Sequence, residues 1–456
     1  MTIIVYPKTY RSAIFLCIAM TSMRSHVVAA GLLLVAVSCF GQFVCQQRNS
    51  NGLYAAGEKA VWTIKPSADY QASNATYTVC QNGTSRVVQQ GTLDFSAGSA
   101  TIEAGLDEPG ALVLELTPAP GWRTNVTTTN AGPRFRHEQT RDGAIIDAAH
   151  LKPSLSRPED FDSWWQQKLL ELDSVPANAQ LEPIDAHVSG VEYFKVTLDN
   201  VRGAHVRGQL AKPGKEGKFP ALLQFQYAGV YPLKRQWVTD RAKAGWLALN
   251  ICAHDMPFDD ENEVQRLADG PLKNYQAIGN TNRESSYFLK MYLGDCQALK
   301  YLVSRPDWDG KTLVVVGDSM GGQQSFATVG LIGEQCHVTA MSVHMPAGAD
   351  VGAASMGRRV GYPNWPSRPD IIETARYFDS CNFAPRIKVP CLVAEGLYDT
   401  IAPPIGGIAA YNLIAGPKEL LTVHSDHMAG DMQASYARRN VWLSALIKGE
   451  APPLKK

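Results

Sequence analysis

Acidic residues are absent from the start of this 456-residue chain, where the first carboxylate is Glu58. An excess of one charge is absent from the whole chain as well, because 43 Lys and Arg residues balance 43 Asp and Glu residues. A protein that binds nucleic acid needs a basic field, so we expect no nucleic-acid partner. Hydrophobic residues make up 45% of the chain and charged residues 19%, which argues against wholesale disorder and predicts a packed globular protein.

Cysteine motifs are missing too, although the chain contains nine cysteines. No two of them have the C-x-x-C spacing that is typical of zinc sites, and their scattered positions suggest no disulfide framework. We therefore expect buried free thiols, with a Cys381–Cys391 disulfide as the open alternative. The sequence implies neither a metal ion nor an organic cofactor.

The apolar run from Val27 to Phe40 has only 14 residues, whereas a membrane-spanning helix needs about 20. Basic residues precede the run, and small and polar residues follow it, which is the pattern of a secretory signal. We expect residues 1–41 to be a signal peptide, with the true start at Met1 or at Met23. The mature protein is then secreted or periplasmic, without stable membrane insertion; a lipoprotein anchored at Cys39 stays open.

Short alternating runs separated by turn residues fill residues 50–118, and this pattern predicts a small Ig-like β-sandwich. The predicted strands are 60–64, 75–79, 91–95 and 111–116. A packing or spacer role is favoured over sugar binding, because Trp62 alone makes no stacking platform. Residues 119–150 are rich in Thr, Asn, Gly and Pro and are predicted to be a linker. The chain is about three typical domain lengths long, so a second, larger domain is expected after it.

From residue 151 to residue 456 the pattern changes to short apolar runs separated by segments of helix length. Residues 161–172 and 288–303 have helical periodicity, and the aromatic side chains of the first segment are predicted to lie in the core. Strands that alternate with helices predict an α/β domain with a doubly wound, mostly parallel sheet covered on both faces. The predicted strands are 222–225, 246–249, 313–316, 338–343, 391–394 and 420–423.

A G-x-S-x-G motif, Gly317-Asp318-Ser319-Met320-Gly321, follows the predicted strand 313–316 directly. In the nucleophile elbow of α/β-hydrolases the chain turns sharply from strand to helix, so the positions two before and two after the serine must lack side chains. A helix-compatible segment follows here as well. The context therefore predicts Ser319 as a catalytic nucleophile.

A serine nucleophile needs a base to take its proton and an acid to orient that base, and in this fold the chain order is Ser, acid, His. Asp399 lies in a loop after the predicted strand 391–394, and His427 follows the last predicted strand. Loops at the carboxyl ends of parallel strands are where ligands meet such sheets. We predict Asp399 as the acid and His427 as the base, with His424 as the rival base and Asp426 as a turn residue.

The oxyanion of a tetrahedral intermediate needs two N–H donors. The residue after the nucleophile, Met320, supplies one, and the loop after the strand that ends at Phe225 supplies the other through Tyr227. The loop with His254 and Asp255 is the alternative source of the second donor.

From about Ala148 onward the chain resembles the acetyl xylan esterase and cephalosporin-C deacetylase family of α/β-hydrolases, which is carbohydrate esterase family 7. The pieces that match are Leu151-Lys152-Pro153-Ser154, Asp160-Phe161-Asp162-Ser163-Trp164, the Tyr227 loop, Ser304-Arg305-Pro306, the elbow, and Gly396-Leu397-Tyr398-Asp399 before Pro403-Pro404. The resemblance implies a secreted serine esterase that acts on an acetylated carbohydrate such as acetylated xylan. Ser319 is then the nucleophile, Asp399 the acid and His427 the base, with Tyr227 and Met320 at the oxyanion hole.

The chain departs from the family pattern at several positions. The family usually has Gln where Met320 stands, Glu where Met428 stands, and Arg-Gly-Gln near His254 and Asp255. The leader and the β-sandwich are additions. These differences keep the triad and leave the acetylated substrate open.

Residues 361–366 are predicted to cap the pocket, where Trp365 either stacks on a sugar ring or packs within the lid. Two alternatives to the esterase stay open: a serine peptidase of the prolyl oligopeptidase kind, and a non-catalytic carbohydrate-binding protein on a hydrolase scaffold. A monomer and a homo-oligomer are both compatible with the sequence.

Overall fold

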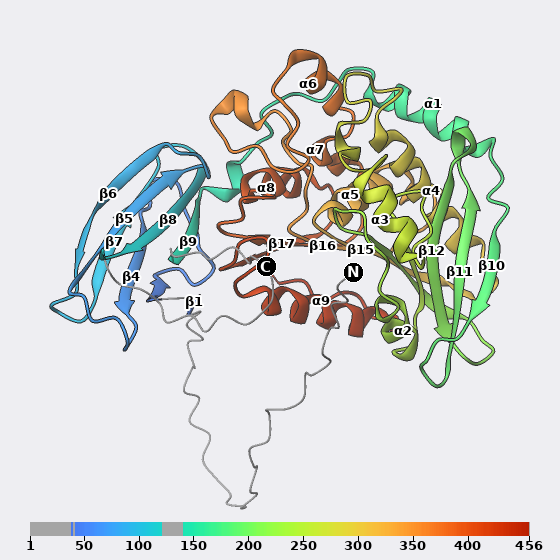
Figure 1. Cartoon of the computed structure of the whole chain (residues 1–456), viewed down its shortest axis with the longest axis horizontal. Coiled ribbons are helices and arrows are strands. Elements are labelled where there is room, and N and C mark those ends of the chain that lie inside the picture. The colour runs from blue at the N-terminus through green and yellow to red at the C-terminus, as the bar shows by residue number, and fades with distance from the viewer. Residues whose placement is uncertain (1–37, 40–41, 121–139, 456) are drawn as a thin grey trace, which may run out of the picture. The chain divides into compact units, whose positions relative to one another are not determined.

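The computed structural model describes residues 38–39, 42–120 and 140–455, and the strands in this part of the chain form three sheets (Figure 1). The predicted signal peptide, residues 1–41, lies outside the described residues except for Ser38 and Cys39. No helix of the described segments is long and apolar enough to cross a membrane. The seven cysteines from Cys45 onward are free thiols, including Cys381 and Cys391, so the disulfide alternative is wrong.

The N-terminal part is a β-sandwich of two small sheets. The four-stranded sheet has the order β1-β2-β4-β7 and the five-stranded sheet the order β3-β9-β8-β5-β6. Hydrophobic residues from both sheets meet in one core, where Phe43 contacts the rings of Tyr70 and Phe95 and Trp62 is fully buried. The strands are β1 Ser38–Cys39, β2 Phe43–Gln47, β3 Leu53–Tyr54, β4 Ala60–Pro66, β5 Asn74–Gln81, β6 Val87–Asp94, β7 Ala100–Ala104, β8 Gly110–Pro118 and β9 Thr140–Ile146.

The limits of the sandwich differ from those predicted. Strand β9 lies inside the predicted linker 119–150, where it pairs antiparallel with β8. Strands β1 and β2 precede residue 50, and β2 pairs with β4. The polar residues Thr140, Arg141 and Asp142 give the start of β9 no apolar alternation, although Asp142 is fully buried. Residues 121–139 lie outside the described residues.

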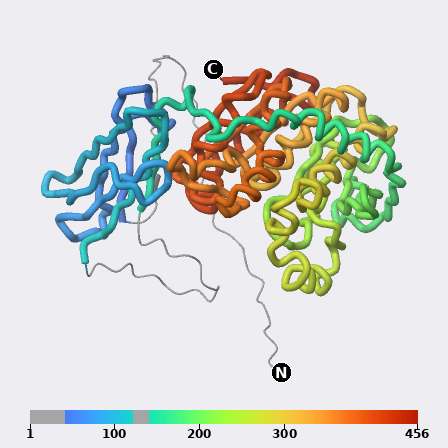
Figure 2. Tube along the Cα trace, turned by 90° about the horizontal axis from the view of Figure 1, so that it is seen from above, coloured from blue at the N-terminus to red at the C-terminus, as the bar shows by residue number. Residues whose placement is uncertain are grey.

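After β9 the chain is bound to the surface of the C-terminal domain before it reaches α1, Phe161–Asp173 (Figure 2). The side-chain amide of Asn412 donates to the carbonyls of Ala148 and Leu151 at 2.8 and 2.9 Å. The backbone N–H of Ser154 donates to Asp350 at 2.6 Å. The connecting segment therefore holds a defined path on the C-terminal domain.

The C-terminal domain is built on a nine-stranded sheet with the order β10-β11-β12-β14-β13-β15-β16-β17-β18. The strands from β14 to β18 pair in parallel, and β10, β11 and β12 add an antiparallel edge that the sequence patterns did not predict. The strands are β10 Gln180–Ile184, β11 Val191–Asp199, β12 His205–Pro213, β13 Phe219–Phe225, β14 Leu247–Ile251, β15 Trp308–Asp318, β16 Ala340–His344, β17 Cys391–Gly396 and β18 Lys418–Val423.

Helices cover both faces of this sheet, as Figure 1 shows. Val314 and Val316 of β15 pack with α2 and α9 on one face, whereas Leu313 and Val315 pack with α4 and α5 on the other. Successive strand residues point to opposite faces, so burial on both sides produces the continuous apolar runs of the sequence. The remaining helices are α2 Gln236–Lys243, α3 Glu261–Asp269, α4 Tyr287–Ser304, α5 Met320–Ile332, α6 Pro369–Ala375, α7 Ser380–Phe383, α8 Pro404–Leu413 and α9 Met432–Leu446.

Helix α1 buries its aromatic face as predicted. Trp164 and Trp165 are 4% and 0% exposed, and Trp165 packs edge-on against Phe383 with the ring centroids 5.5 Å apart. Its Nε1–H donates to the carbonyl of Tyr377 at 3.0 Å. These rings therefore fix the start of the C-terminal domain and are not available to a ligand.

The sandwich packs against loops at the carboxyl end of the large sheet. Val113 and Ile145 of the sandwich share a buried cluster with Leu397 and Tyr398, which follow β17. Gly143 of β9 has no room for a side chain, because a Cβ there would lie 2.2 Å from the carbonyl oxygen of Leu397. Leu397 lies two positions before Asp399, so the sandwich supports a loop that carries a predicted site residue.

Candidate active site

Ser319 stands at a sharp turn between β15 and α5. Its backbone has φ 54° and ψ −121°, a conformation that side chains rarely adopt and that strained functional positions often have. A Cβ on Gly317 would lie 2.0 Å from the carbonyl oxygen of Gly321, and one on Gly321 would lie 2.9 Å from the carbonyl oxygen of Phe225. Both glycines of the motif are therefore required by close packing of the backbone, as the nucleophile elbow demands.

The structure brings Ser319, His427 and Asp399 together in a chain of short contacts. The Oγ of Ser319 lies 2.8 Å from Nε2 of His427, and Nδ1 of His427 lies 2.6 Å from Oδ2 of Asp399. The second oxygen of Asp399 accepts from the backbone N–H groups of Ile401 and Ala402, both at 2.8 Å. With its carboxylate held in place, Asp399 fixes the orientation of the imidazole, which leaves Nε2 free to take a proton from Ser319.

The rival base His424 lies elsewhere. Its Nδ1 is 2.7 Å from Oδ1 of Asp142 in the sandwich, and its Nε2 is 2.9 Å from the carbonyl oxygen of Ser50. Asp426 accepts from the backbone N–H groups of Met428 and Ala429, as a turn residue does. The geometry therefore selects His427 over His424 as the partner of Ser319.

Two backbone N–H groups, those of Met320 and Tyr227, are the candidate donors of an oxyanion hole. Met320 is the first residue of α5, so its N–H has no partner within the helix, and Tyr227 follows β13 in the loop alongside. Within the described residues neither N–H donates to an acceptor. The side-chain amide of Gln324 donates to the carbonyl of Gln226 at 2.8 Å and so ties the loop to α5.

The alternative oxyanion loop is occupied by structural contacts. His254 is buried, and its ring nitrogens lie 2.7 Å from the hydroxyl of Tyr287 and 3.1 Å from the carbonyl oxygen of Gly229. Burial lowers the pKa of His254 to about 4. Asp255 pairs with Arg207 at 2.9 Å. The side chains of this loop are therefore engaged in structural contacts, one of them with the Tyr227 loop through Gly229.

Trp365 does not take the sugar-stacking role that was one of its two predicted alternatives. The residue is 5% exposed, and its ring packs edge-on against Phe288 with centroids 5.2 Å apart. Its Nε1–H donates to the carbonyl of Gln276 at 2.6 Å. Because both the ring and the N–H are engaged inside the protein, Trp365 belongs to the packing of the lid.

Two tyrosines near the nucleophile escaped the sequence analysis. The hydroxyls of Tyr275 and Tyr362 lie 2.7 Å apart, and their oxygens lie 3.4 and 3.0 Å from Sδ of Met320. Burial raises the pKa of both hydroxyls, so both stay protonated donors at neutral pH. Tyr362 lies in the stretch 361–366 that was predicted as a cap, whereas no local signal marks Tyr275.

The described residues contain no group of three or more His, Cys, Asp or Glu side chains that is arranged to hold a metal ion. The arrangement of Ser319, His427 and Asp399 instead suits acyl transfer, in which a hydroxyl attacks a carbonyl and an imidazole moves the proton. A parallel sheet with helices on both faces and a serine at the strand-to-helix turn after β15 defines the α/β-hydrolase class. The predicted fold class is thereby confirmed.

Within that class the chain belongs to the acetyl xylan esterase (AXE1) family, whose sequence profile matches residues 146–346 and 361–446. It is 31% identical over 310 residues to the acetyl esterase Axe7A of Xylanibacter ruminicola. This alignment covers 65% of this chain and 69% of that protein. The chain is therefore a carboxylic ester hydrolase of the carbohydrate esterase kind, as the resemblance implied.

Two solved structures share the fold at 23% sequence identity. The acetyl xylan esterase from Paenibacillus sp. R4 superposes with a TM-score of 0.55 over 64% of this chain and 97% of its own. Acetyl xylan esterase 1 from Thermoanaerobacterium sp. JW/SL YS485 gives a TM-score of 0.52 over 64% of this chain and 96% of its own. Nearly the whole of each solved chain matches about two thirds of this chain, so the protein has an α/β-hydrolase domain and an additional N-terminal region.

Proposed function

We propose that this protein is a secreted serine esterase that removes acetyl groups from acetylated polysaccharides or oligosaccharides, such as acetylated xylan, through an acyl-enzyme. The observation that carries the proposal is the chain of contacts from Ser319 Oγ through His427 to Asp399, with distances of 2.8 and 2.6 Å. Membership of the acetyl xylan esterase family supports a short acyl group on a carbohydrate as the substrate.

Acylation begins when Oγ of Ser319 attacks the acetyl carbonyl while Nε2 of His427 takes the hydroxyl proton. The carbonyl oxygen becomes an oxyanion, and in this mechanism the N–H groups of Met320 and Tyr227 donate to it. Collapse of the tetrahedral intermediate breaks the bond to the sugar oxygen, which leaves with the proton from His427. Acetyl-Ser319 and a free sugar hydroxyl are the products of this half-reaction.

Deacylation repeats the sequence with water. His427 takes a proton from the water molecule as its oxygen attacks the acetyl carbonyl, and the second intermediate releases Ser319 Oγ, which recovers the proton. Acetic acid leaves and ionises in solution. Asp399 stays ionised throughout and stabilises the imidazolium that forms in each half-reaction.

Secretion is part of the proposal because polymeric glycans lie outside the cell. The basic start and the 14-residue apolar run before residue 41 support export. The seven free thiols are compatible with export, because all of them except Cys80 are buried.

The test compares wild type with Ser319→Ala on p-nitrophenyl acetate and on longer p-nitrophenyl esters. We expect wild type to prefer the acetate and the variant to lose about 10⁴-fold or more in kcat with its circular dichroism unchanged. Equal turnover by the variant would refute the mechanism. Acetate release from acetylated xylo-oligosaccharides tests the substrate class, and cleavage of prolyl peptides without acetate release would favour the peptidase alternative.

A further inference from the structure

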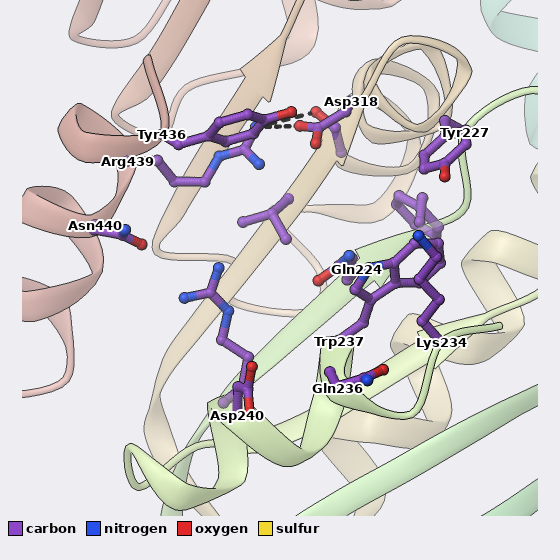
Figure 3. Close-up of a pocket in the computed structure, with 14 residues that line it drawn as sticks. Gln224, Tyr227, Lys234, Gln236, Trp237, Asp240, Asp318, Tyr436, Arg439 and Asn440 are labelled. Atoms are coloured by element: carbon purple, nitrogen blue, oxygen red, sulfur yellow. Dashed lines mark hydrogen bonds and ion pairs between the residues drawn. The ribbon is translucent and has the colours of Figure 1, made fainter. Parts of the chain in front are cut away.

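A cavity of about 440 Å³ lies between α2 and α9, over the strands β13 and β15 (Figure 3). Gln224 and Gly317 belong to its strand side, Trp237 and Gln236 come from α2, and Tyr436 comes from α9. Its volume lies within the range of small-ligand sites. The mechanism proposed above uses no residue of α2 or α9, so it gives the helical side of this cavity no role.

The cavity adjoins the nucleophile. Asp318, which lines it, directly precedes Ser319, and Tyr227 of the proposed oxyanion hole lines it as well. The ring of Tyr436 lies 4.9 Å from that of His344, whose carbonyl accepts from the backbone N–H of Ser319 at 2.9 Å. A glycan bound at Ser319 therefore has this cavity as a neighbour.

Two arginines line the cavity, and their surroundings differ. Arg439 is buried, and it donates to Asp318 at 2.6 Å and to the hydroxyl of Ser342 at 3.1 Å. Its charge is therefore neutralised by Asp318. The guanidinium of Arg241 forms no hydrogen bond or ion pair with any residue of the described segments, although the residue is half-buried. A guanidinium has five N–H donors, so Arg241 presents unused donors to the cavity.

The charges around Arg241 favour the arrival of an anion. Burial and the charge of Arg439 lower the pKa of Arg241. A negative group that binds beside the guanidinium therefore stabilises its charged form. The charges of Asp318 and Asp240 act on Arg241 in the opposite direction. Three cations, Lys234, Arg241 and Arg439, and two carboxylates, Asp240 and Asp318, line the cavity, so its lining carries one net positive charge.

The other lining residues suit a sugar ring. The ring centroids of Tyr227 and Trp237 lie 5.7 Å apart, and Tyr227 is 39% exposed, so an aromatic surface faces the cavity. Gln224, Gln236 and Asn440 place side-chain amides around it, as Figure 3 shows. Apolar rings combined with a few polar groups are typical of sites that bind a ligand with hydroxyl groups.

We infer that this cavity binds a uronic acid residue of the acetylated glycan, with its carboxylate on the guanidinium of Arg241. The inference rests on the proposed function and narrows its substrate class to acetylated glycans that carry acidic sugars. Arginine suits this task because its planar fork matches a carboxylate in two parallel hydrogen bonds. The aromatic rings and the amides then hold the face and the hydroxyls of the same sugar.

Kinetics on two acetylated xylo-oligosaccharides, one with a glucuronic acid branch and one without, test the inference. Wild type should hydrolyse the acidic substrate with a kcat/KM about tenfold higher, the effect of one charge-assisted hydrogen bond. Arg241→Gln should remove this preference by raising the KM for the acidic substrate. Lys243→Gln is the matched control, because it removes an exposed charge of α2 that does not line the cavity and should keep the preference.

Binding to Ser319→Ala separates this inference from the proposed function. Calorimetry should show at least tenfold tighter binding of a deacetylated glucuronic acid-bearing oligosaccharide than of its neutral counterpart, and the double variant Ser319→Ala/Arg241→Gln should lose the difference. Equal binding of both oligosaccharides, or inorganic phosphate bound as tightly as the acidic oligosaccharide, would overturn the inference. If the binding preference is present but neither substrate loses acetate, the proposed function fails and the cavity assignment stands.

Discussion

Asp142 of the sandwich and His424 of the C-terminal domain form a buried ion pair three residues ahead of His427. The atoms Oδ1 and Nδ1 lie 2.7 Å apart, and the two residues are 0% and 5% exposed. The other ring nitrogen faces the carbonyl of Ser50 at 2.9 Å. Both nitrogens meet acceptors, so His424 satisfies both contacts only as an imidazolium. The pair therefore joins the sandwich to the loop of the proposed base.

The pH dependence of stability should reveal this pair. Burial alone would lower the pKa of His424, but the hydrogen bond and charge of Asp142 raise it above its ordinary value of 6.5. A raised folded-state pKa means that the stabilisation is complete below about pH 6.5 and disappears as the pH rises through the folded-state pKa. We expect the difference in unfolding free energy between wild type and His424→Gln to be largest near pH 6 and to shrink toward pH 9.

A matched control exists in the exposed pair of His150 and Asp147, whose atoms lie 2.6 Å apart with the imidazole 72% exposed. His150→Gln should change the free energy of unfolding little at any pH, because exposed pairs contribute little. Asp142→Asn should cost about 3–5 kcal/mol at pH 6, since it leaves a buried charge without its partner. Equal pH profiles for His424→Gln and wild type would contradict the assignment.

Gly143→Ala tests whether the sandwich positions the loop of the acid. Its Cβ would lie 2.2 Å from the carbonyl oxygen of Leu397, so the backbone two residues before Asp399 has to move. A misplacement of about 1 Å at a catalytic group costs up to about 100-fold, and we expect kcat on p-nitrophenyl acetate to fall between tenfold and 100-fold. Gly105→Ala, whose Cβ would meet Lys59 at an ordinary 3.4 Å, should retain wild-type kcat. Unchanged kcat in Gly143→Ala would show that the contact is tolerated.

The elbow could be predicted from the sequence because its requirements are local. The motif from Gly317 to Gly321 and the buried parallel strand before it lie in one short segment, although the contact that requires Gly321 comes from the distant Phe225. Asp399 and His427 could be placed because each follows an apolar strand whose carboxyl end reaches the same edge of the sheet. These features depend on neighbouring residues, which a sequence displays directly.

Features that depend on distant partners could not be predicted. Trp365 packs against Phe288, which is far from it in the sequence. An aromatic residue at this position is therefore compatible with both packing and ligand binding when the sequence alone is read. Strand β9 carries Asp142, whose burial becomes reasonable only with His424 on the other domain. Strands β10 to β12 are antiparallel, and β10 and β11 are largely half-buried or exposed. Polar residues interrupt the apolar pattern in all three strands, including the mostly buried β12, so they lack the apolar runs of the buried parallel strands.

The variant Asp399→Asn tests whether Asp399 acts by orienting the imidazole of His427 or only by placing a negative charge near it. Oδ1 of Asp399 accepts from the N–H groups of Ile401 and Ala402, so an asparagine would keep its oxygen there and turn its NH₂ toward Nδ1 of His427. That NH₂ forces the tautomer with the proton on Nε2, which cannot accept the proton of Ser319. We expect kcat to fall about 10⁴-fold with the melting temperature nearly unchanged.

Asp426→Asn is the control for that variant, because it removes a carboxylate next to His427 while its oxygen continues to accept from Met428 and Ala429. Its kcat should stay within a few-fold of wild type. If both variants lost activity equally, negative charge near the imidazole would explain the effect, and the orienting role of Asp399 would be lost.

Glu395 should be a neutral acid in the folded protein. Its carboxyl group is fully buried one strand residue from the loop of Asp399, and neither oxygen has a hydrogen-bond partner in the described part of the chain. Burial, and to a lesser degree the charge of Asp399, raise its pKa well above the ordinary value. Wild type should therefore show an infrared band of a protonated carboxyl at neutral pH that is absent from Glu395→Gln.

The raised pKa of Glu395 should also change how the unfolding free energy depends on pH. Above about pH 4.5 the unfolded chain releases this proton while the folded chain keeps it, so stability falls as the pH rises. Glutamine has no proton to lose. The unfolding free energy of Glu395→Gln should therefore rise relative to that of wild type by up to about 1.4 kcal/mol per pH unit between pH 5 and the folded-state pKa. Urea unfolding at pH 5, 6 and 7 measures the trend, with the exposed Glu216→Gln as the control. A difference that stays constant across this range would mean that Glu395 is ionised when folded, because only a group that keeps its proton in the native state produces the slope.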